Sequence, residues 1–239
     1  MAAIASEGAR LVGHCDVVVA TDDERIAALA RDLGLGVAMT EVAISSGSGR
    51  AWAAARQRIP APSIIVNLQG DAPFVPPSMI TALVQALRRS SHAVATPVVA
   101  LTWDALDALR THKLTSPFSG TTCTRRADGR ALWFSKTVIP AIRNESQLRD
   151  AMPLSPVYRH IGLYAYRFDA LRHFEETEPT PYERIEGLEQ LRFLESGQDI
   201  LTVEVASPAH AMSGIDTAQD VALAENLIAE LGDPHLSWR

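Results

Sequence analysis

The sequence predicts an α/β fold with a mostly parallel sheet, and three observations lead to it. Short apolar segments rich in β-branched residues alternate with segments that have the periodicity of amphipathic helices. The clearest apolar segment, 63–68, is apolar on both faces, as expected for a strand covered on both sides. The chain of 239 residues is 47% apolar and 21% charged, which is ordinary for a globular protein.

The first half of the chain is predicted to alternate strands with helices. It starts like the middle of an amphipathic helix, and the next helix follows a capping box at 21–24 and carries Ile26, Leu29 and Leu33. Two further helices are expected at 49–58 and from Pro76-Pro77 onward. The strands of this half are expected at 17–20, 36–39, 63–68 and 93–101.

The second half is predicted to hold a hairpin and then a mixture of strands and helices. Strands 121–126 and 131–135 flank the turn Ala127-Asp128-Gly129, and residues 140–156 have no firm period and are expected to form a loop. The remaining elements are expected as a strand at 158–167, helices at 168–176 and 182–196, a strand at 200–206 and a helix at 217–231. Without a repeat or an obvious linker, 1–239 is interpreted as one domain with a hairpin-bearing insertion.

Composition excludes several classes of protein. No run approaches the roughly 20 apolar residues of a membrane-spanning helix, and no secretory signal is visible at the start. The net charge of −6 disfavours a nucleic-acid-binding protein. The only cysteines, Cys15 and Cys123, are too far apart in the sequence for a metal motif and suggest a reducing compartment or simply inert thiols.

Two aspartates follow predicted strands and are candidate metal ligands. Asp71 comes after strand 63–68 and a glycine, at the edge where open α/β sheets bind ligands, and a carboxylate there suits Mg²⁺. The alternative is that Asp71 only caps a turn. Asp216 precedes the last helix, where a helix N-cap alone would explain it. If the two carboxylates meet at one sheet edge, they could share a metal.

Three weaker candidates lie elsewhere in the chain. His160, in the alternating segment 158–164, could orient a ligand hydroxyl or carboxylate, or could be structural. The glutamates of the helix after Pro181 recur every three residues, which more often marks a solvated face. The hydroxyl- and glycine-rich loop 45–50 ends in Arg50 and suits a phosphate or ribose.

Taken in order, these segments resemble one known family. The matching segments are Val-Val-Val-Ala-Thr-Asp-Asp-Glu, Ser-Gly-Ser-Gly-Arg, Val-Asn-Leu-Gln-Gly-Asp-Ala-Pro, Ala-Leu-Trp-Phe-Ser-Lys-Thr-Val-Ile-Pro, Arg-His-Ile-Gly-Leu-Tyr-Ala-Tyr-Arg, Leu-Glu-Gln-Leu-Arg and Gly-Ile-Asp-Thr. Together, over about residues 10–231, they resemble the 3-deoxy-manno-octulosonate cytidylyltransferases, or CMP-Kdo synthetases.

The resemblance implies a fold and a reaction. The fold is a nucleotide-diphospho-sugar-transferase-like three-layer sandwich with a dimerisation subdomain, so a cytoplasmic homodimer is expected. The reaction joins CTP and the acid sugar Kdo to give CMP-Kdo and pyrophosphate for lipopolysaccharide or capsule synthesis, with Mg²⁺ neutralising charge. Asp71 and Asp216 match the family's metal-binding positions. The positions that match its sugar pocket and its nucleotide-contacting segment are Gln69, His160, Tyr164, Glu189, Gln190, and Ser46, Gly47 and Arg50.

The chain departs from the family pattern at three places. Ile44 and Gly49 stand where the family usually has a histidine and an acid, and Lys136 replaces an arginine. The strand and triphosphate-binding loop that open the family have no counterpart, so we expect an N-terminally incomplete domain with weak turnover or none. A cytidylyltransferase for a related acid sugar, and an inactive nucleotide-sugar-binding paralogue, are the alternatives.

Overall fold

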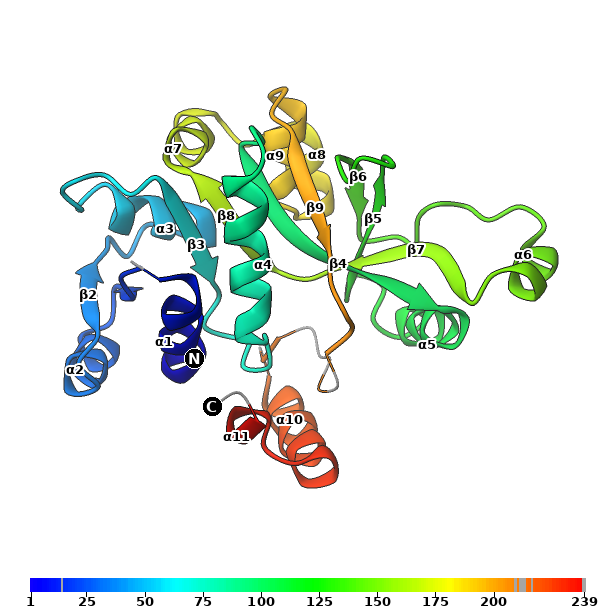
Figure 1. Cartoon of the computed structure of the whole chain (residues 1–239), viewed down its shortest axis with the longest axis horizontal. Coiled ribbons are helices and arrows are strands. Elements are labelled where there is room, and N and C mark those ends of the chain that lie inside the picture. Colours follow the sequence, from blue (N-terminus) through cyan, green and yellow to red (C-terminus); the bar gives the residue numbers. More distant parts are fainter. Residues whose placement is uncertain (14, 209, 211–213, 216, 238–239) are drawn as a thin grey trace.

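The fold consists of helices on both faces of a central sheet, and it is described by a computed structural model for residues 1–13, 15–208, 210, 214–215 and 217–237 (Figure 1). Its strands are β1 Val18–Thr21, β2 Gly36–Met39, β3 Ile64–Leu68, β4 Val94–Thr102, β5 Thr121–Arg125, β6 Ala131–Ser135, β7 Leu154–His160, β8 Leu163–Arg167 and β9 Ile200–Glu204. Its helices are α1 Ala2–Val12, α2 Glu24–Asp32, α3 Gly47–Ala55, α4 Pro77–Arg88, α5 Trp103–Lys113, α6 Glu145–Ala151, α7 Phe168–Glu176, α8 Pro181–Glu186, α9 Gln190–Glu195, α10 Ala218–Leu231 and α11 Pro234–Ser237.

The main sheet is mostly antiparallel, so the prediction of a mostly parallel sheet is wrong. Only β9 runs parallel to the central strand β4. On the other edge of β4, β8 pairs with its first half and β7 with its second half, both antiparallel. Beyond this edge the sheet has two branches. In one branch β8 pairs with β3, and in the other β7 pairs with β5, which pairs with β6. The strands β3 and β4 run in the same direction, as predicted, but β8 lies between them and runs the other way.

Most predicted elements are confirmed, and the errors have local causes. Residues 140–156 are not a loop, because they contain α6 and the start of β7. The predicted strand 158–167 is interrupted at 161–162, between β7 and β8. The predicted helix 182–196 is divided by Gly187, which has the left-handed φ of 63°. The helix α5 was not predicted.

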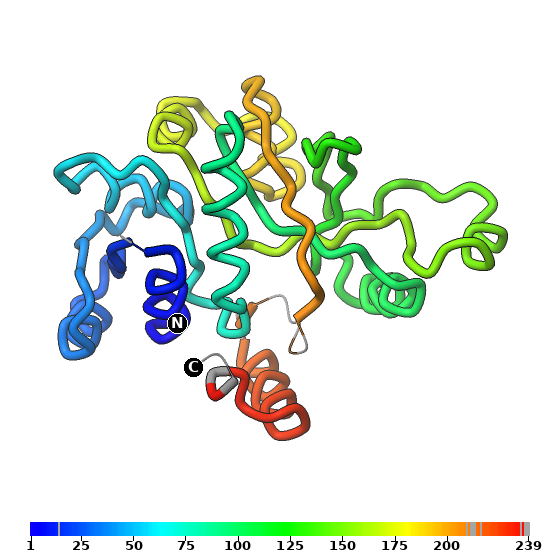
Figure 2. Tube along the Cα trace, in the orientation of Figure 1, coloured from blue at the N-terminus to red at the C-terminus, as the bar shows by residue number. Residues whose placement is uncertain are grey.

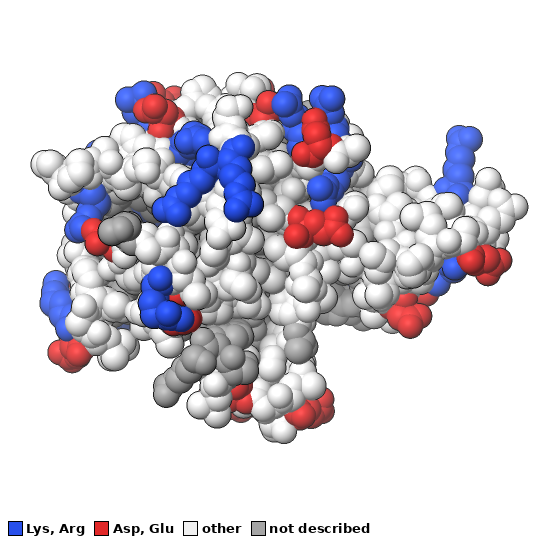
Figure 3. Space-filling model, in the orientation of Figure 1, with Lys and Arg blue, Asp and Glu red and all other residues white. Residues whose placement is uncertain are grey.

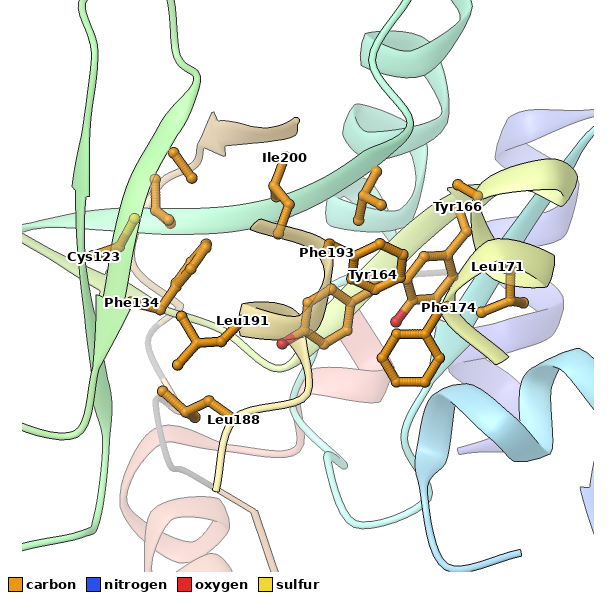
Figure 4. Close-up of a cluster of buried hydrophobic side chains, with 14 residues drawn as sticks. Cys123, Phe134, Tyr164, Tyr166, Leu171, Phe174, Leu188, Leu191, Phe193 and Ile200 are labelled. Atoms are coloured by element: carbon orange, nitrogen blue, oxygen red, sulfur yellow. The ribbon is translucent and has the colours of Figure 1, made fainter. Parts of the chain in front are cut away.

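Two apolar cores lie on opposite faces of the sheet. On one face, α1 and α4 cover β3, β8 and β4. On the other face, shown in Figure 4, the aromatic rings stack in series from Tyr164 through Tyr166 and Phe193 to Phe174, with centroid distances of 5.7, 5.6 and 4.9 Å. Offset aromatic contacts of this kind contribute beyond the area they bury. This second core supports the strand that carries Tyr164.

The parallel pair β1–β2 forms its own small sheet, and α2 packs beside it. The helix α2 buries Ala27 and Ala30, whereas the predicted apolar stripe of Ile26, Leu29 and Leu33 is 50, 60 and 57% exposed. The strand β3 is half-buried along its length, not covered on both sides as its composition predicts. At the other end of the molecule an arm (residues 103–120 and 136–153) extends away from the sheet (Figure 2).

The close contact of α1 with α4 leads to a first testable prediction. Gly8 is buried in this contact, and a Cβ added to it would lie 2.5 Å from Cδ1 of Ile80. We therefore expect Gly8→Val to reduce the free energy of unfolding by about 1–3 kcal/mol through overpacking. Ser6→Val, on the exposed side of the same helix, controls for the helix propensity of valine. Equal denaturant midpoints for the two variants would contradict the prediction.

Candidate functional site

A cavity of about 700 Å³ opens on one side of the sheet. It is lined by the end of β7 and the start of β8 (residues 159–164) and by several other segments. These include the loop after β3 (residues 69–75), α5, residues 119–121, the turn between α8 and α9 (residues 187–190), and the start of α10. Ligand sites of α/β proteins lie at such a position, beyond the carboxyl end of a strand like β3.

Five of the residues predicted from the sequence line this cavity together, although they come from three separate segments. They are Gln69, His160, Tyr164, Glu189 and Gln190. Tyr164 is 7% exposed, and burial raises the pKa of its hydroxyl well above its ordinary value. The hydroxyl therefore stays protonated at neutral pH and can donate a hydrogen bond. Nε2 of Gln190 is enclosed without a protein hydrogen-bond partner among the described residues.

His160 is held neutral in the cavity wall. Its ring packs edge-on against Phe134, with a centroid distance of 5.2 Å, and lies 5.4 Å from the ring of Tyr164. Burial, together with the positive charge of Lys136, lowers the pKa of His160 to about 3. The imidazole is therefore uncharged throughout the neutral range.

Glu189 connects the cavity to the predicted nucleotide loop. Its carboxylate accepts hydrogen bonds from the backbone N–H groups of Gly47 and Ser48, at 3.1 and 3.2 Å. These groups belong to the first turn of α3, where unpaired N–H groups and the helix dipole favour an anion. Ser46 is the N-cap of the same helix, and its Oγ accepts from the N–H of Gly49 at 2.9 Å. The loop is therefore beside the cavity, but Ser46 and Gly47 do not line it.

Arg50 does not line the cavity. Its guanidinium donates to Oγ1 of Thr40 and to the carbonyl oxygen of Ile44, and forms an ion pair with Asp22 at 3.3 Å. These contacts fix the loop 40–46 against β1 and β2. The structure therefore does not bring Arg50 to the candidates that line the cavity, and its guanidinium is already engaged by protein groups.

Asp71 lies at the end of β3, beside the segment that leads into α10. Its carbonyl oxygen accepts from the N–H of Ile215 at 2.8 Å, and a Cβ on Gly214 would come within 3.0 Å of its Oδ2. Gly214, with φ 146°, is therefore required both by the backbone conformation and by the close approach of the carboxylate. Asp216, the second predicted metal ligand, lies outside the described residues.

Two cations line the cavity near His160, and sequence reasoning did not assign either to the site. Burial lowers the pKa of both Lys136 and Arg159. Close by, the ammonium of Lys113 donates to the carbonyls of Ser119 and Gly120 at 2.6 and 2.8 Å and to the carbonyl of Lys136 at 2.5 Å, so it ties the start of β5 to the residue that follows β6. The sequence signal for these two residues is a basic residue at the end of, or within, a predicted strand, in Phe-Ser-Lys (134–136) and Tyr-Arg-His (158–160). Together the cations make this end of the cavity suitable for an anionic ligand.

Among the described residues, no group of three His, Cys, Asp or Glu is placed to hold a metal ion. A magnesium ion does not need such a group, because it is usually bound by one or two carboxylates together with substrate phosphates. Asp71, beyond the end of β3 and beside the 214–215 segment, fits that type of site. No helix in the part of the chain that the structure describes is long and apolar enough to cross a membrane.

Comparisons with known proteins agree in sequence and in structure. The family described as Cytidylyltransferase matches residues 1–200. A 3-deoxy-manno-octulosonate cytidylyltransferase of Maricaulis maris is 37% identical, over 91% of this chain and 82% of the relative. That of Xanthomonas campestris pv. campestris is 40% identical, over 94% and 87%. A solved CMP:2-keto-3-deoxy-manno-octonic acid synthetase in complex with CTP superposes with a TM-score of 0.81 at 28% identity, over 96% of this chain and 87% of that one.

Proposed function

The chain belongs to the family of 3-deoxy-manno-octulosonate cytidylyltransferases, and from this premise we propose how its cavity joins CTP to Kdo. The products are CMP-Kdo and pyrophosphate, so the protein is a nucleotidyltransferase. The observation that carries the proposal is the single cavity in which Gln69, His160, Tyr164, Glu189 and Gln190 meet, with cations at one end and Asp71 beyond the end of β3.

The reaction joins two anions, so the site must neutralise charge before they can meet. The anomeric hydroxyl of Kdo attacks the α-phosphorus of CTP; the new bond is O–P, the bond to the β-phosphate oxygen breaks, and pyrophosphate leaves. The hydroxyl proton passes to a base or to water. Lys136 and Arg159 are proposed to bind the sugar carboxylate, because they are the cations that line the cavity. Tyr164 and Gln190 are proposed to donate hydrogen bonds to sugar oxygens.

The proposed cofactor is Mg²⁺, with Asp71 as a ligand and Asp216 as the second. The ion would supply charge neutralisation at the phosphoryl oxygens and orient the nucleophile. Asp71 is held in place through its carbonyl by Ile215, and its carboxylate lies against Gly214, so the protein fixes its position before any ligand binds. A preorganised carboxylate avoids a reorganisation cost at the moment of reaction.

The test of the proposed function is pyrophosphate release measured with the full chain, CTP, Mg²⁺ and Kdo. We expect pyrophosphate to be released only when both CTP and Kdo are present. A low rate of release would still agree with the proposed function. Sialic acid and an amino-Kdo are assayed in parallel, because Ile44 and Gly49 depart from the family pattern beside α3. Preference for one of these sugars would support the related-sugar alternative. CTP binding without turnover on any of them would favour a nucleotide-sugar-binding protein.

Lys136 provides a test of the carboxylate site. We expect Lys136→Met to raise KM for Kdo about 10- to 100-fold, because one charge-assisted hydrogen bond is lost, with little change in KM for CTP. Arg126→Met, which removes an exposed cation from the tip of the β5–β6 hairpin, is the matched control. Equal KM values for Kdo in the two variants would contradict the assignment.

We also propose that the chain forms a homodimer through the arm, in the cytoplasm, where the reaction would draw on CTP. Large apolar side chains of the arm are exposed, notably Leu114 at 84% and Phe118 at 73%. Much of the arm's surface on the face drawn in Figure 3 carries neither Lys, Arg, Asp nor Glu. Light scattering coupled to size exclusion checks this proposal, and a monomer at micromolar concentration would contradict it.

A further inference from the structure

The hydroxyl of Thr96 lies inside the sheet, between the central strand β4 and the break that separates β7 from β8. Thr96 is 0% exposed. Its Oγ1 is 2.8 Å from Nε2 of His160 and 2.8 Å from the carbonyl oxygen of Leu163. A buried hydroxyl thus contacts a cavity residue on one side and a backbone acceptor on the other.

These two contacts determine where the protons are. A threonine hydroxyl has one proton to donate, and a carbonyl oxygen can only accept. Since the Leu163 carbonyl accepts from Oγ1, the contact with His160 is a hydrogen bond only if Nε2 carries the proton and donates it to Oγ1. A neutral imidazole has a single N–H, so Nδ1 is then unprotonated and acts as an acceptor.

The break in the strand explains why this hydroxyl is needed. The pairing with β4 passes from Ala95 opposite Ala165 to Val98 opposite His160, so two residues of β4 face the four residues 161–164. Residue 97 is proline and has no N–H to donate to the opposite strand. The Leu163 carbonyl is instead satisfied by the side chain of Thr96. Bulges of this kind are frequent beside active sites, where they redirect side chains.

We propose that Thr96 is a positioning residue that fixes His160 as the Nε2–H tautomer, so that Nδ1 accepts a hydrogen bond from a ligand hydroxyl in the cavity. His160 lines the cavity, and Nδ1 has no hydrogen-bond partner among the residues that the structure describes. The rings of Phe134 and Tyr164 restrict the imidazole from two directions. Thr96 therefore acts through His160 and does not touch the ligand.

The proposal decides between the two ligand groups that the sequence left open for His160, a hydroxyl and a carboxylate. A neutral nitrogen that only accepts repels a carboxylate and favours a hydroxyl donor. The carboxylate of an acid sugar then belongs with Lys136 and Arg159, and one of its hydroxyl groups belongs with His160. This assignment of the hydroxyl rests on the proposed function, whereas the tautomer depends only on the geometry of the free protein.

The tautomer is tested by long-range ¹H–¹⁵N correlation spectra of the ¹⁵N-labelled full chain without ligand. The seven histidines are distinguished by comparison with His160→Gln, which removes the signals of one ring. The expected spectrum shows Nε2 protonated and Nδ1 unprotonated from pH 5 to pH 8. Thr96→Ser, which keeps the hydroxyl, should preserve it, whereas Thr96→Val should give a mixture of tautomers. A protonated Nδ1 in the parent chain would overturn the proposal, as would an unchanged spectrum in Thr96→Val.

Kinetics provide a second readout. We expect Thr96→Val to lower kcat/KM for Kdo about 3- to 10-fold, the effect of one neutral hydrogen bond, with KM for CTP unchanged and rescue by Thr96→Ser. If Thr96→Val does not fold, the parent spectrum still decides the tautomer, and a protonated Nδ1 in the parent or in Thr96→Ser would overturn the proposal. If the parent chain has no activity with Kdo but shows the expected tautomer, the proposed function fails and the role of Thr96 stands.

Discussion

Replacing Asp71 with asparagine is expected to slow CMP-Kdo formation by about a hundredfold or more, because the Mg²⁺ that we propose it binds would supply several kcal/mol of charge stabilisation. The substitution separates the two interpretations of this residue. Asparagine keeps the ability to cap a turn but has no negative charge. If Asp71 only supported the turn in which the N–H of Ala72 donates to the carbonyl of Gln69, the variant would remain active.

The measurement is single-turnover formation of pyrophosphate over a range of Mg²⁺ concentrations, with enzyme in excess over substrate. Asp71→Asn should lose both rate and the dependence on Mg²⁺. Asp150→Asn removes the same charge from an exposed position on the arm and serves as the control. A far-ultraviolet spectrum and an unfolding midpoint close to those of the parent chain show that the variant is folded. A variant that kept the parent's rate and Mg²⁺ dependence would refute the metal assignment.

Local sequence patterns predicted the elements better than their directions. The apolar periodicity around Ile80 and Leu83 and the Asp128-Gly129 turn each specify a helix or a hairpin within a short window. The direction of a strand depends instead on which strand lies beside it. The placement of β8 between β3 and β4 is a pairing over nearly 100 residues, as in Val66 with Ala165, and no short pattern encodes it. The helix α5 was missed because its buried face is small, with Trp103 and Leu106 as its buried residues.

The same distinction applies to the site. His160 and Tyr164, which the structure places together in the cavity wall, were predicted because a strand with alternating polar residues shows in the sequence itself. The contacts that set the chemistry of the cavity residues are long-range. Thr96 contacts His160 across 64 residues of sequence, and Gly47 contacts Glu189 across 142. For Arg50 the motif predicts a nucleotide contact, whereas in the structure its guanidinium donates to Thr40 and to the carbonyl of Ile44, which no short pattern encodes.

The segment that carries Glu189 and Gln190 is held by a buried ion pair between Arg192 and Glu183. Each side chain is only 10% exposed, and two hydrogen bonds of 2.7 and 2.5 Å join the guanidinium to the carboxylate. The same guanidinium donates to the carbonyl of Phe174 at 3.1 Å and lies 3.8 Å from the centre of its ring. The pair thereby ties α8 and α9 to the end of α7, with the cavity-lining turn between them.

Removing one partner leaves the other as an uncompensated buried charge, which costs about 3–5 kcal/mol. For a chain of this size we expect Arg192→Ala to lower Tm by on the order of 10 °C. Arg184→Ala, an exposed position on α8, is the control and should change Tm little. Arg192→Lys keeps the charge but loses the two-pronged geometry, so its Tm should lie between those of Arg192→Ala and the parent.

The double variant Glu183→Leu with Arg192→Leu tests whether the uncompensated buried charge causes the loss of stability expected for Arg192→Ala. Because it removes both buried charges and restores apolar volume, it should be more stable than Arg192→Ala although it lacks more of the native contacts. If desolvated charge is the cause, Tm will recover although leucine cannot reproduce the hydrogen bonds to the carbonyls of Phe174 and Thr177 that fix α9. A double variant less stable than Arg192→Ala would mean that the hydrogen bonds, and not the unpaired charge, dominate the stability of this segment.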